Sequence, residues 1–288
     1  MSDRRIRGVY RGDRRHWVGD GFYVTNVFPA NDLGAAISPF LLMDYHAPYE
    51  YGPTDRPRGV GSHPHRGFET VTLAFEGRVA HHDSTGGGGV IGPGDAQWMT
   101  AASGILHKEY HEQSWARQGG RMHMMQLWVN LPAVHKMDAP RYQPLLAADM
   151  GHVELPDGAG TVRVIAGEYL GATGPAKTHT HINLWEARLE PGGRADMAFP
   201  ASENAAVFVL DGDATVNGAT ATATELVLTA NDGEHVAVTT DDGAHLLVLG
   251  GEPIDETVVS WGPFVMNTAQ EIREAVDDFN AGRFGYLE

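Results

Sequence analysis

Short runs rich in β-branched and aromatic residues recur along the chain, and they constrain its fold more than any other feature. Examples are FETVTLAF at 68–75, TVRVIAGEY at 161–169, AAVFVLDGDATV at 205–216 and AHLLVLGG at 244–251. The 36 glycines and 16 prolines supply turns between such runs. Many short strands separated by turn residues predict an all-β fold, either one sandwich or barrel or two of them.

Two segments of the chain resemble each other. LAFEGRVAHHD at 73–83 and FVLDGDATVNG at 208–218 both give an apolar strand, an acidic-Gly turn and a second strand, so that Gly77 aligns with Gly212. Hydrophobic residues make up 42% of the 288 residues, which is enough for a core in each half. We therefore expect a duplicated β-barrel, with domains at residues 1–132 and 133–288 and a connecting stretch from about 131 to 162.

The end of the chain has a different pattern. Thr268, followed three residues later by Glu271, resembles a capping box. Ile272, Val276 and Phe279 then fall at helical spacing, and Gly282 can end the helix. We expect a short C-terminal α-helix packed on a β domain.

Composition excludes several classes of function. The formal net charge is -16, from 21 Lys+Arg against 37 Asp+Glu, and such a surface repels phosphate backbones, so direct nucleic-acid binding is disfavoured. Cysteine is absent, which rules out disulfides, thiolate metal sites and a cysteine nucleophile. No run of about 18 apolar residues occurs, so we expect no membrane span and a cytoplasmic protein. The sequence also has neither a phosphate-loop Lys after GGGG nor a GxSxG nucleophile elbow.

Two short motifs have the spacing of metal ligands. His63 and His65 are two residues apart, and so are His107 and Glu109. Residues two apart on a strand project from the same face, about 6 to 7 Å from each other. If the two strands meet inside one barrel, three imidazoles and one carboxylate converge. That set favours Fe(II), with Mn, Co, Ni or Zn as alternatives.

Other residues compete for the same role. Glu69 shares the face of His65 but lies about 13 Å further along a straight strand. His81 and His82 follow the acidic-Gly turn, where we expect a rim or solvent position. His111 is expected past the end of its strand, and His123 in a core or pocket wall.

A second His-x-His motif, at His179 and His181, could belong to another site. The internal alignment disfavours it, because residues 63 and 65 align with Ala198 and Pro200. We therefore expect that the second barrel has no metal. Later histidines that could complete such a site are His235 and His245.

Four longer motifs identify a family resemblance. HPHRGFETVT at 63–72, HHDSTGGGGVIGPGDAQWMTAASGILHKE at 81–109, QLWVNLP at 126–132 and GEPIDETVVSWGPFVMNTAQEI at 251–272 together resemble the pirin family of the cupin superfamily. The resemblance runs nearly end to end. It departs at DSTGG, where the family often has DSxGN, and at Thr257, where Pro is common.

The resemblance implies a bicupin with two jelly-roll-like β-barrels. The first barrel would hold one metal, usually iron, through His63, His65, His107 and Glu109, and the second would hold none. Similar proteins include quercetin 2,3-dioxygenases, which implies cleavage of a flavonol by dioxygen with release of carbon monoxide, and Glu109 as general base.

The pocket and the partners can be predicted in the same way. A flat aromatic substrate needs a largely apolar pocket, and we expect a monomer that binds a small aromatic molecule and dioxygen. Two alternatives stay open: a non-enzymatic iron-binding redox regulator that acts through a protein partner, as described for eukaryotic pirins, and a metal-binding cupin acting on another small molecule. The residues expected to line the pocket are Phe68, Phe75, Trp98, Met125, Gln126 and Trp128.

Overall fold

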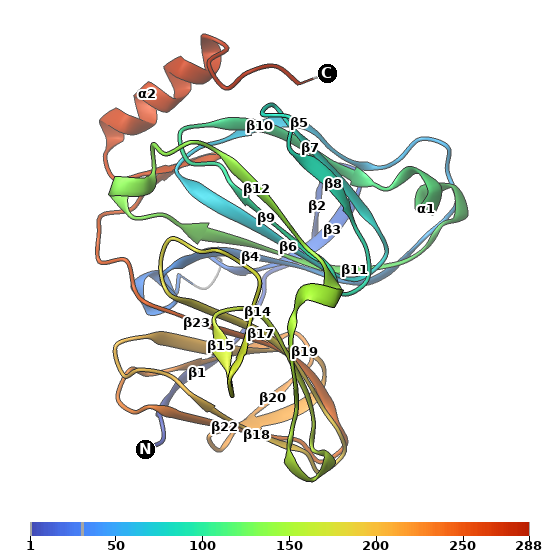
Figure 1. The fold of residues 1–288 in the computed structure, drawn as a ribbon, viewed down its shortest axis with the longest axis vertical. Helices are drawn as coiled ribbons and strands as arrows, with labels where there is room; N and C mark the ends of the chain where they lie inside the picture. The colour runs from blue at the N-terminus through green and yellow to red at the C-terminus, as the bar shows by residue number, and fades with distance from the viewer. Residues whose placement is uncertain (1, 30–31, 288) are drawn as a thin grey trace. The chain divides into compact units, whose positions relative to one another are not determined.

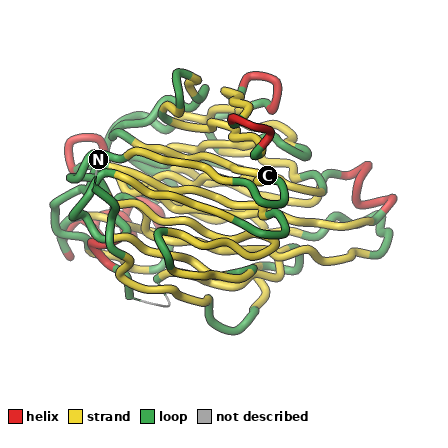
Figure 2. The backbone as a smooth tube through the Cα atoms, turned by 90° about the horizontal axis from the view of Figure 1, so that it is seen from below, coloured by secondary structure: helices red, strands yellow, loops and turns green. Residues whose placement is uncertain are grey.

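The computed structural model describes residues 2–29 and 32–287. Strands form most of this part of the chain (Figure 2), so the all-β prediction is confirmed. The chain groups into two compact units. The N-terminal unit comprises Arg14–Asn26, Phe40–Ala147 and Ile254–Glu288, and the C-terminal unit comprises Met1–Asp13, Val27–Pro39 and Ala148–Pro253. No helix in the described ranges is long and apolar enough to cross a membrane.

The N-terminal unit contains two facing antiparallel sheets (Figure 1). One has the order β12 (Arg141–Leu145), β9 (Ala96–Thr100), β6 (Phe68–Glu76), β11 (Gly120–Asn130), β4 (Phe40–Tyr51), β3 (Phe22–Phe28), β2 (His16–Val18). The other has the order β5 (Gly59–His65), β10 (Ile105–His111), β7 (Val79–Asp83), β8 (Gly88–Ile91). Smaller elements are α1 (Gln113–Gln118), the 3₁₀ turn η2 (Ala133–His135), the pair β24 (Val259–Trp261) and β25 (Phe264–Met266), and α2 (Ala269–Asn280).

The C-terminal unit repeats the pairing pattern. Its main path is β1 (Ile6–Arg11), β21 (Glu225–Thr229), β19 (Asn204–Val216), β23 (Ala244–Gly251), β17 (Ile182–Leu189), β14 (Gly160–Ala166), β13 (Gly151–Glu154). Off this path lie β18 (Arg194–Ala198), β20 (Ala219–Thr222) and β22 (His235–Thr239), and β15 (Glu168–Tyr169) pairs with β16 (Ala172–Thr173). Three 3₁₀ turns complete the elements: η1 (Gly34–Ala36), η3 (Ala147–Asp149) and η4 (Pro156–Gly158). Just as β6 pairs with β9 and β11, β19 pairs with β21 and β23, and the pair β5–β10 has its counterpart in β18–β22.

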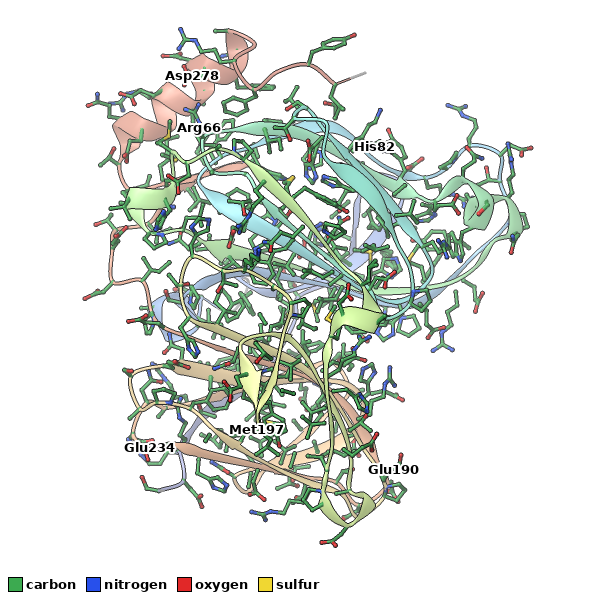
Figure 3. All side chains as sticks on the ribbon, viewed as in Figure 1. Arg66, His82, Glu190, Met197, Glu234 and Asp278 are labelled. Atoms are coloured by element: carbon green, nitrogen blue, oxygen red, sulfur yellow. The ribbon has the colours of Figure 1, made fainter. Side chains whose placement is uncertain are left out.

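The bounds of the two units differ from the predicted division between residues 132 and 133. Strand β1 pairs with β21 of the C-terminal unit, with Val9 opposite Val227. The last 35 residues belong to the N-terminal unit, where Arg66 donates a hydrogen bond of 2.8 Å to Asp278 of α2 (Figure 3). The expected connecting stretch from 131 to 162 contains β12, which pairs with β9. Pairing between strands distant in sequence sets these bounds, and a linear alignment of the halves does not show it.

The predicted C-terminal helix is confirmed as α2. The Thr268 hydroxyl accepts a hydrogen bond of 3.2 Å from the Glu271 backbone N–H, and the Glu271 carboxylate accepts one of 3.1 Å from the Asn267 N–H. The first bond satisfies a backbone donor that the first helical turn leaves unpaired, and the second pairs the N–H of the residue just before the N-cap. Ile272 and Ala275 pack in a buried cluster with Phe264, Met266 and Phe284.

The interior of the N-terminal unit changes from apolar to polar along its strands. At one end, Ala74, Val79 and Met124 belong to a buried apolar cluster. Because side chains two apart share a face, the next inward positions are Thr72 on β6, His81 on β7 and Gln126 on β11. The apolar core thus occupies one end of this unit, and polar side chains fill the other.

Candidate metal centre

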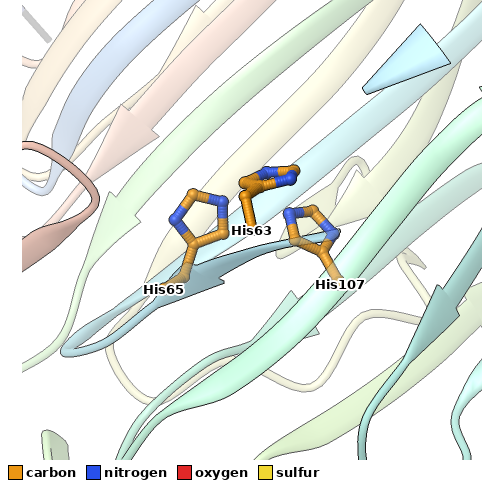
Figure 4. Close-up of side chains that lie close together, drawn as sticks. All are labelled: His63, His65 and His107. Atoms are coloured by element: carbon orange, nitrogen blue, oxygen red, sulfur yellow. The ribbon is translucent and has the colours of Figure 1, made fainter. Parts of the chain in front are cut away.

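Three predicted ligands converge inside the N-terminal unit (Figure 4). In the antiparallel pair β5–β10, His107 lies opposite His63 and Ile105 lies opposite His65. One nitrogen from each of His63, His65 and His107 lies within 4.8 Å of the others, and the three rings point toward one another. The fourth predicted ligand, Glu109, belongs to a second such group, with His107 and His81. The structure therefore places Glu109 beside His107.

The imidazoles have free nitrogens for a metal. His65 Nδ1 and His107 Nε2 are buried and have no hydrogen-bond partner among the described residues. His63 Nδ1 donates to the Gly61 carbonyl at 2.8 Å, which leaves its Nε2 as a lone-pair donor. An unpaired buried polar atom costs about 1 to 3 kcal/mol, so an ion that binds both nitrogens removes that cost.

The protonation of the rings also suits a metal. Burial, and then the neighbouring His63, hold the pKa of His65 well below its usual value. Burial, and then His65 and His63, do the same for the pKa of His107. Both rings are therefore neutral at physiological pH, which is the form that binds metals. Neutral imidazoles next to a carboxylate can hold a divalent transition metal.

Three amide and hydroxyl donors hold the Glu109 carboxylate. Thr72 Oγ1 donates to Oε1 at 3.2 Å, Gln97 Nε2 donates to the same oxygen at 2.5 Å, and Gln126 Nε2 donates to Oε2 at 2.9 Å. Glu109 is only 4% exposed. The three donors lie on β6, β9 and β11 of the seven-stranded sheet. They orient Glu109, which lies on β10 of the four-stranded sheet. Thr72 and Gln97 were not among the predicted site residues. Each lies two residues along its strand from another inward-facing residue, and this alternation could have identified them.

His81 lies inside the site, and its predicted rim position is wrong. It is 0% exposed, because on β7 it shares the inward face of Val79 and Asp83. Its ring stacks on Tyr142, with ring centroids 4.8 Å apart and an interplanar angle of 17°. The prediction holds for His82, which is exposed on the outer face (Figure 3).

Asp83 ends the same strand as a buried carboxylate. Burial alone would raise its pKa, but hydrogen bonds from His81, Thr85 and Gly87 lower the pKa of Asp83 to about 2. Asp83 is therefore ionised at every pH where the protein is ordinarily studied. The conspicuous HxD pattern at 81–83 was the sequence signal that could have identified both residues.

The competing residues lie elsewhere. Glu69 is on the opposite face of β6, where the Thr100 hydroxyl donates to it at 2.6 Å. His111 is the last residue of β10, not beyond it, and its Nε2 donates to the Gly21 carbonyl at 2.8 Å. His123 is buried, as expected of a core residue, with its Nε2 2.9 Å from the Tyr45 hydroxyl.

The six predicted pocket residues divide between two faces of the large sheet. Phe68, Gln126 and Trp128 share the face of Thr72, toward Glu109. Each of the other three lies an odd number of residues along its strand from Thr72, Gln97 or Gln126. Their side chains therefore project to the opposite face of the sheet, and their prediction as pocket residues is wrong. These are Phe75, Trp98 and Met125.

Comparisons with known proteins agree with this geometry. The family model Pirin matches residues 21–129, and the model for the Pirin C-terminal cupin domain matches residues 184–285. The chain belongs to the pirin family. A candidate quercetin 2,3-dioxygenase of Pseudomonas aeruginosa is 50% identical to this pirin over 281 residues, which is 98% of each chain. A pirin-like protein of Solanum lycopersicum is 36% identical and covers 93% of this pirin and 89% of its own length. The crystal structure of a quercetin 2,3-dioxygenase from Acinetobacter baumannii is 44% identical, with a TM-score of 0.96 over 100% of both chains.

The C-terminal cupin domain of this pirin has an apolar interior where the first has its histidines. Met197 of β18 (Figure 3) and Val236 and Val238 of β22 are 0% exposed and belong to one large apolar cluster. The later histidines considered for a second site pair with different carboxylates. His181 lies 2.6 Å from Glu203, His235 lies 2.6 Å from Asp3 and 2.8 Å from Asp196, and His245 lies 2.7 Å from Glu186.

Proposed function

We propose that this pirin is a metal-dependent dioxygenase that cleaves flavonols such as quercetin and releases carbon monoxide. The observation that carries the proposal is the group of His63, His65 and His107 beside Glu109, in which buried nitrogens of His65 and His107 have no hydrogen-bond partner among the described residues. The similarity to proteins named as quercetin 2,3-dioxygenases adds the substrate class. The ligands would be these four residues, and Fe(II) is the preferred ion, with Mn, Co, Ni or Zn as alternatives.

In this proposal Glu109 is the residue that would move a proton. The ion, when bound, supplies a Lewis acid that lowers the pKa of the flavonol 3-hydroxyl and a centre for reaction with dioxygen. Glu109 Oε1 accepts hydrogen bonds from Thr72 and Gln97, whereas Oε2 accepts one, from Gln126. Oε2 therefore keeps one free lone pair, which would hold the ion or, when Glu109 is briefly released from it, would accept the 3-hydroxyl proton as general base.

An aromatic wall stands beside the ligands. The rings of Phe68 and Trp128 lie 4.3 Å apart, and the His65 ring is 5.0 Å from the first and 5.4 Å from the second. Such a wall suits a flat aromatic substrate and limits the access of water. The Trp128 indole N–H is buried with no partner among the described residues, so it is available to donate to a substrate oxygen.

The remaining expectations belong to the same proposal. We infer a cytoplasmic monomer, with a small aromatic molecule and dioxygen as its partners. The net charge of -16 supports the absence of direct nucleic-acid binding.

The proposal is tested with Fe(II)-loaded protein and quercetin in air. We expect loss of the flavonol absorbance and release of carbon monoxide well above a free-iron control. Glu109→Gln should lower turnover at least about 100-fold, the range of general-base catalysis. Glu50→Gln, on the exposed part of β4, is the matched control and should change little.

Turnover no higher than that of free iron would refute the dioxygenase. If such inactive protein bound another protein only in one oxidation state of its iron, the regulatory alternative would be supported.

A further inference from the structure

Two buried side chains outside the proposed ligand set form a line behind His107. Asp83 Oδ2 lies 3.4 Å from His81 Nε2, and His81 Nδ1 lies 3.3 Å from His107 Nδ1. Asp83, His81 and His107 are 4%, 0% and 1% exposed. The line ends at His107 Nε2, the buried atom that has no hydrogen-bond partner among the described residues.

Asp83 sets the direction of the hydrogen bonds along this line. Its Oδ1 already accepts from the Thr85 backbone N–H at 2.9 Å, the Thr85 hydroxyl at 2.7 Å and the Gly87 N–H at 2.9 Å. The carboxylate is therefore fixed in the turn with Oδ2 facing His81, and it can only accept.

The tautomers of both rings follow from that acceptor. His81 Nε2 must donate to Asp83, so in a neutral ring His81 Nδ1 is a lone pair. His107 Nδ1 then donates to His81, and the lone pair of His107 falls on Nε2, toward His63 and His65. A neutral imidazole whose two nitrogens are both engaged in this way has none left for a metal, so His81 is not a ligand here.

We propose that Asp83 and His81 are positioning residues that hold His107 as its Nδ1–H tautomer and aim Nε2 at the metal. The inference rests on the proposed metal site. Tyr142, stacked on the His81 ring, fixes the plane of that ring. Tyr142 also donates through its hydroxyl to Gln97 Oε1 at 3.2 Å, and Gln97 donates to Glu109. One tyrosine of β12 thus supports residues that orient both His107 and Glu109.

The tautomers can be measured without any metal. Long-range ¹H–¹⁵N NMR of metal-free protein with ¹⁵N-labelled histidine should show the Nε2–H form of His81 and the Nδ1–H form of His107. The opposite tautomer at either ring would overturn the proposal. The wild-type measurement suffices if a variant fails to fold.

Asp83→Asn should reverse the direction of the hydrogen bonds along this line with almost no change in the shape of the side chain. The amide oxygen keeps the bonds from Thr85 and Gly87, so the amide N–H₂ faces His81 and donates to Nε2. His81 then becomes the Nδ1–H tautomer, and His107 carries its proton on Nε2, where it blocks the metal. Asp95→Asn is the matched control, because Asp95 also accepts a turn N–H, from Gly92 at 3.0 Å, outside this line.

Zn(II) affinity, measured by competition with a chelator, gives a readout apart from activity. Asp83→Asn should weaken binding about 10- to 100-fold, as observed for residues that support metal ligands, and Asp95→Asn should bind as wild type. Unchanged affinity of Asp83→Asn would overturn the proposal, as would a His81 nitrogen directly coordinated in the zinc-loaded protein. Absence of zinc binding by the wild type would instead refute the proposed metal site. Normal zinc binding and tautomers without quercetin turnover would refute only the proposed reaction.

Discussion

Replacing Glu186 by Gln should destabilise the C-terminal unit by about 3 kcal/mol at neutral pH. Glu186 of β17 is 5% exposed and accepts hydrogen bonds from Arg163, from His245 at 2.7 Å and from Arg188 at 3.2 Å. Burial alone would raise its pKa, but the His245 hydrogen bond and the Arg163 charge lower the pKa of Glu186 from 4.5 to about 2. A shift of about 2.5 pKa units at 1.36 kcal/mol per unit gives the predicted loss.

The same shift fixes the pH dependence of the loss. Because the folded-state pKa is depressed, the contribution is complete above the unfolded pKa of about 4.5 and disappears as the pH falls through about 2. The difference between wild type and Glu186→Gln should therefore shrink to roughly half its neutral-pH value, or less, at pH 3. Urea unfolding followed by circular dichroism, for wild type and variant at pH 7 and pH 3, measures both values.

The control is Glu190→Gln, an exposed glutamate just after the same strand (Figure 3), which should change stability by less than about 0.5 kcal/mol. A loss below about 1 kcal/mol at pH 7, or one that does not shrink at pH 3, would refute the assignment of a strongly stabilised carboxylate.

Three further substitutions test the N-terminal unit. Gln126→Leu removes the donor to Glu109 Oε2 and should lower kcat for quercetin about tenfold or more with unchanged metal content; equal kcat would show that this contact does not orient the base. Trp128→Phe keeps the contact with Phe68 but loses the indole N–H, so KM should rise about tenfold with kcat unchanged if the N–H binds substrate, and no change in KM would exclude that contact. Arg66→Met removes hydrogen bonds to the Ser103 carbonyl at 2.7 Å and to Asp278 at 2.8 Å, and should cost about 2 kcal/mol; a calorimetric Tm equal to that of wild type would show that this pair does not stabilise α2.

Local patterns predicted the elements well, and non-local pairing limited the prediction of domains. The capping box at Thr268 predicted α2 correctly, because its two hydrogen bonds join residues three and four apart. The pairing of β1 with β21 joins Val9 to Val227, and no local pattern marks it. Strand β12 was likewise read as part of a connection, although Tyr142 on it stacks on His81.

The site shows the same limit at the level of single residues. Spacing two apart on a strand identified His63 with His65 and His107 with Glu109, because each pair needs only the alternation of one strand. Predicting the pocket residues requires knowing which face of each strand points toward the metal ligands. Phe75, Trp98 and Met125 were predicted without that knowledge and lie on the other face. His81 was missed for the same reason, although it shares its face with Asp83.

The contrast between the two units explains why the polar residues form a set. Strands β5 and β10 carry His65, His107 and Glu109 into the interior, whereas the corresponding pair β18 and β22 carries Met197 and Val238. A single polar residue in the apolar interior would leave a buried donor or acceptor unpaired at a cost of about 1 to 3 kcal/mol. Stepwise loss of the ligands would therefore be unfavourable at each intermediate. Two kinds of interior avoid that cost. One keeps the whole polar set, which comprises the ligands, Gln97, Gln126 and the Asp83–His81 pair, as in the N-terminal unit. The other replaces the whole set with apolar side chains, as in the C-terminal unit.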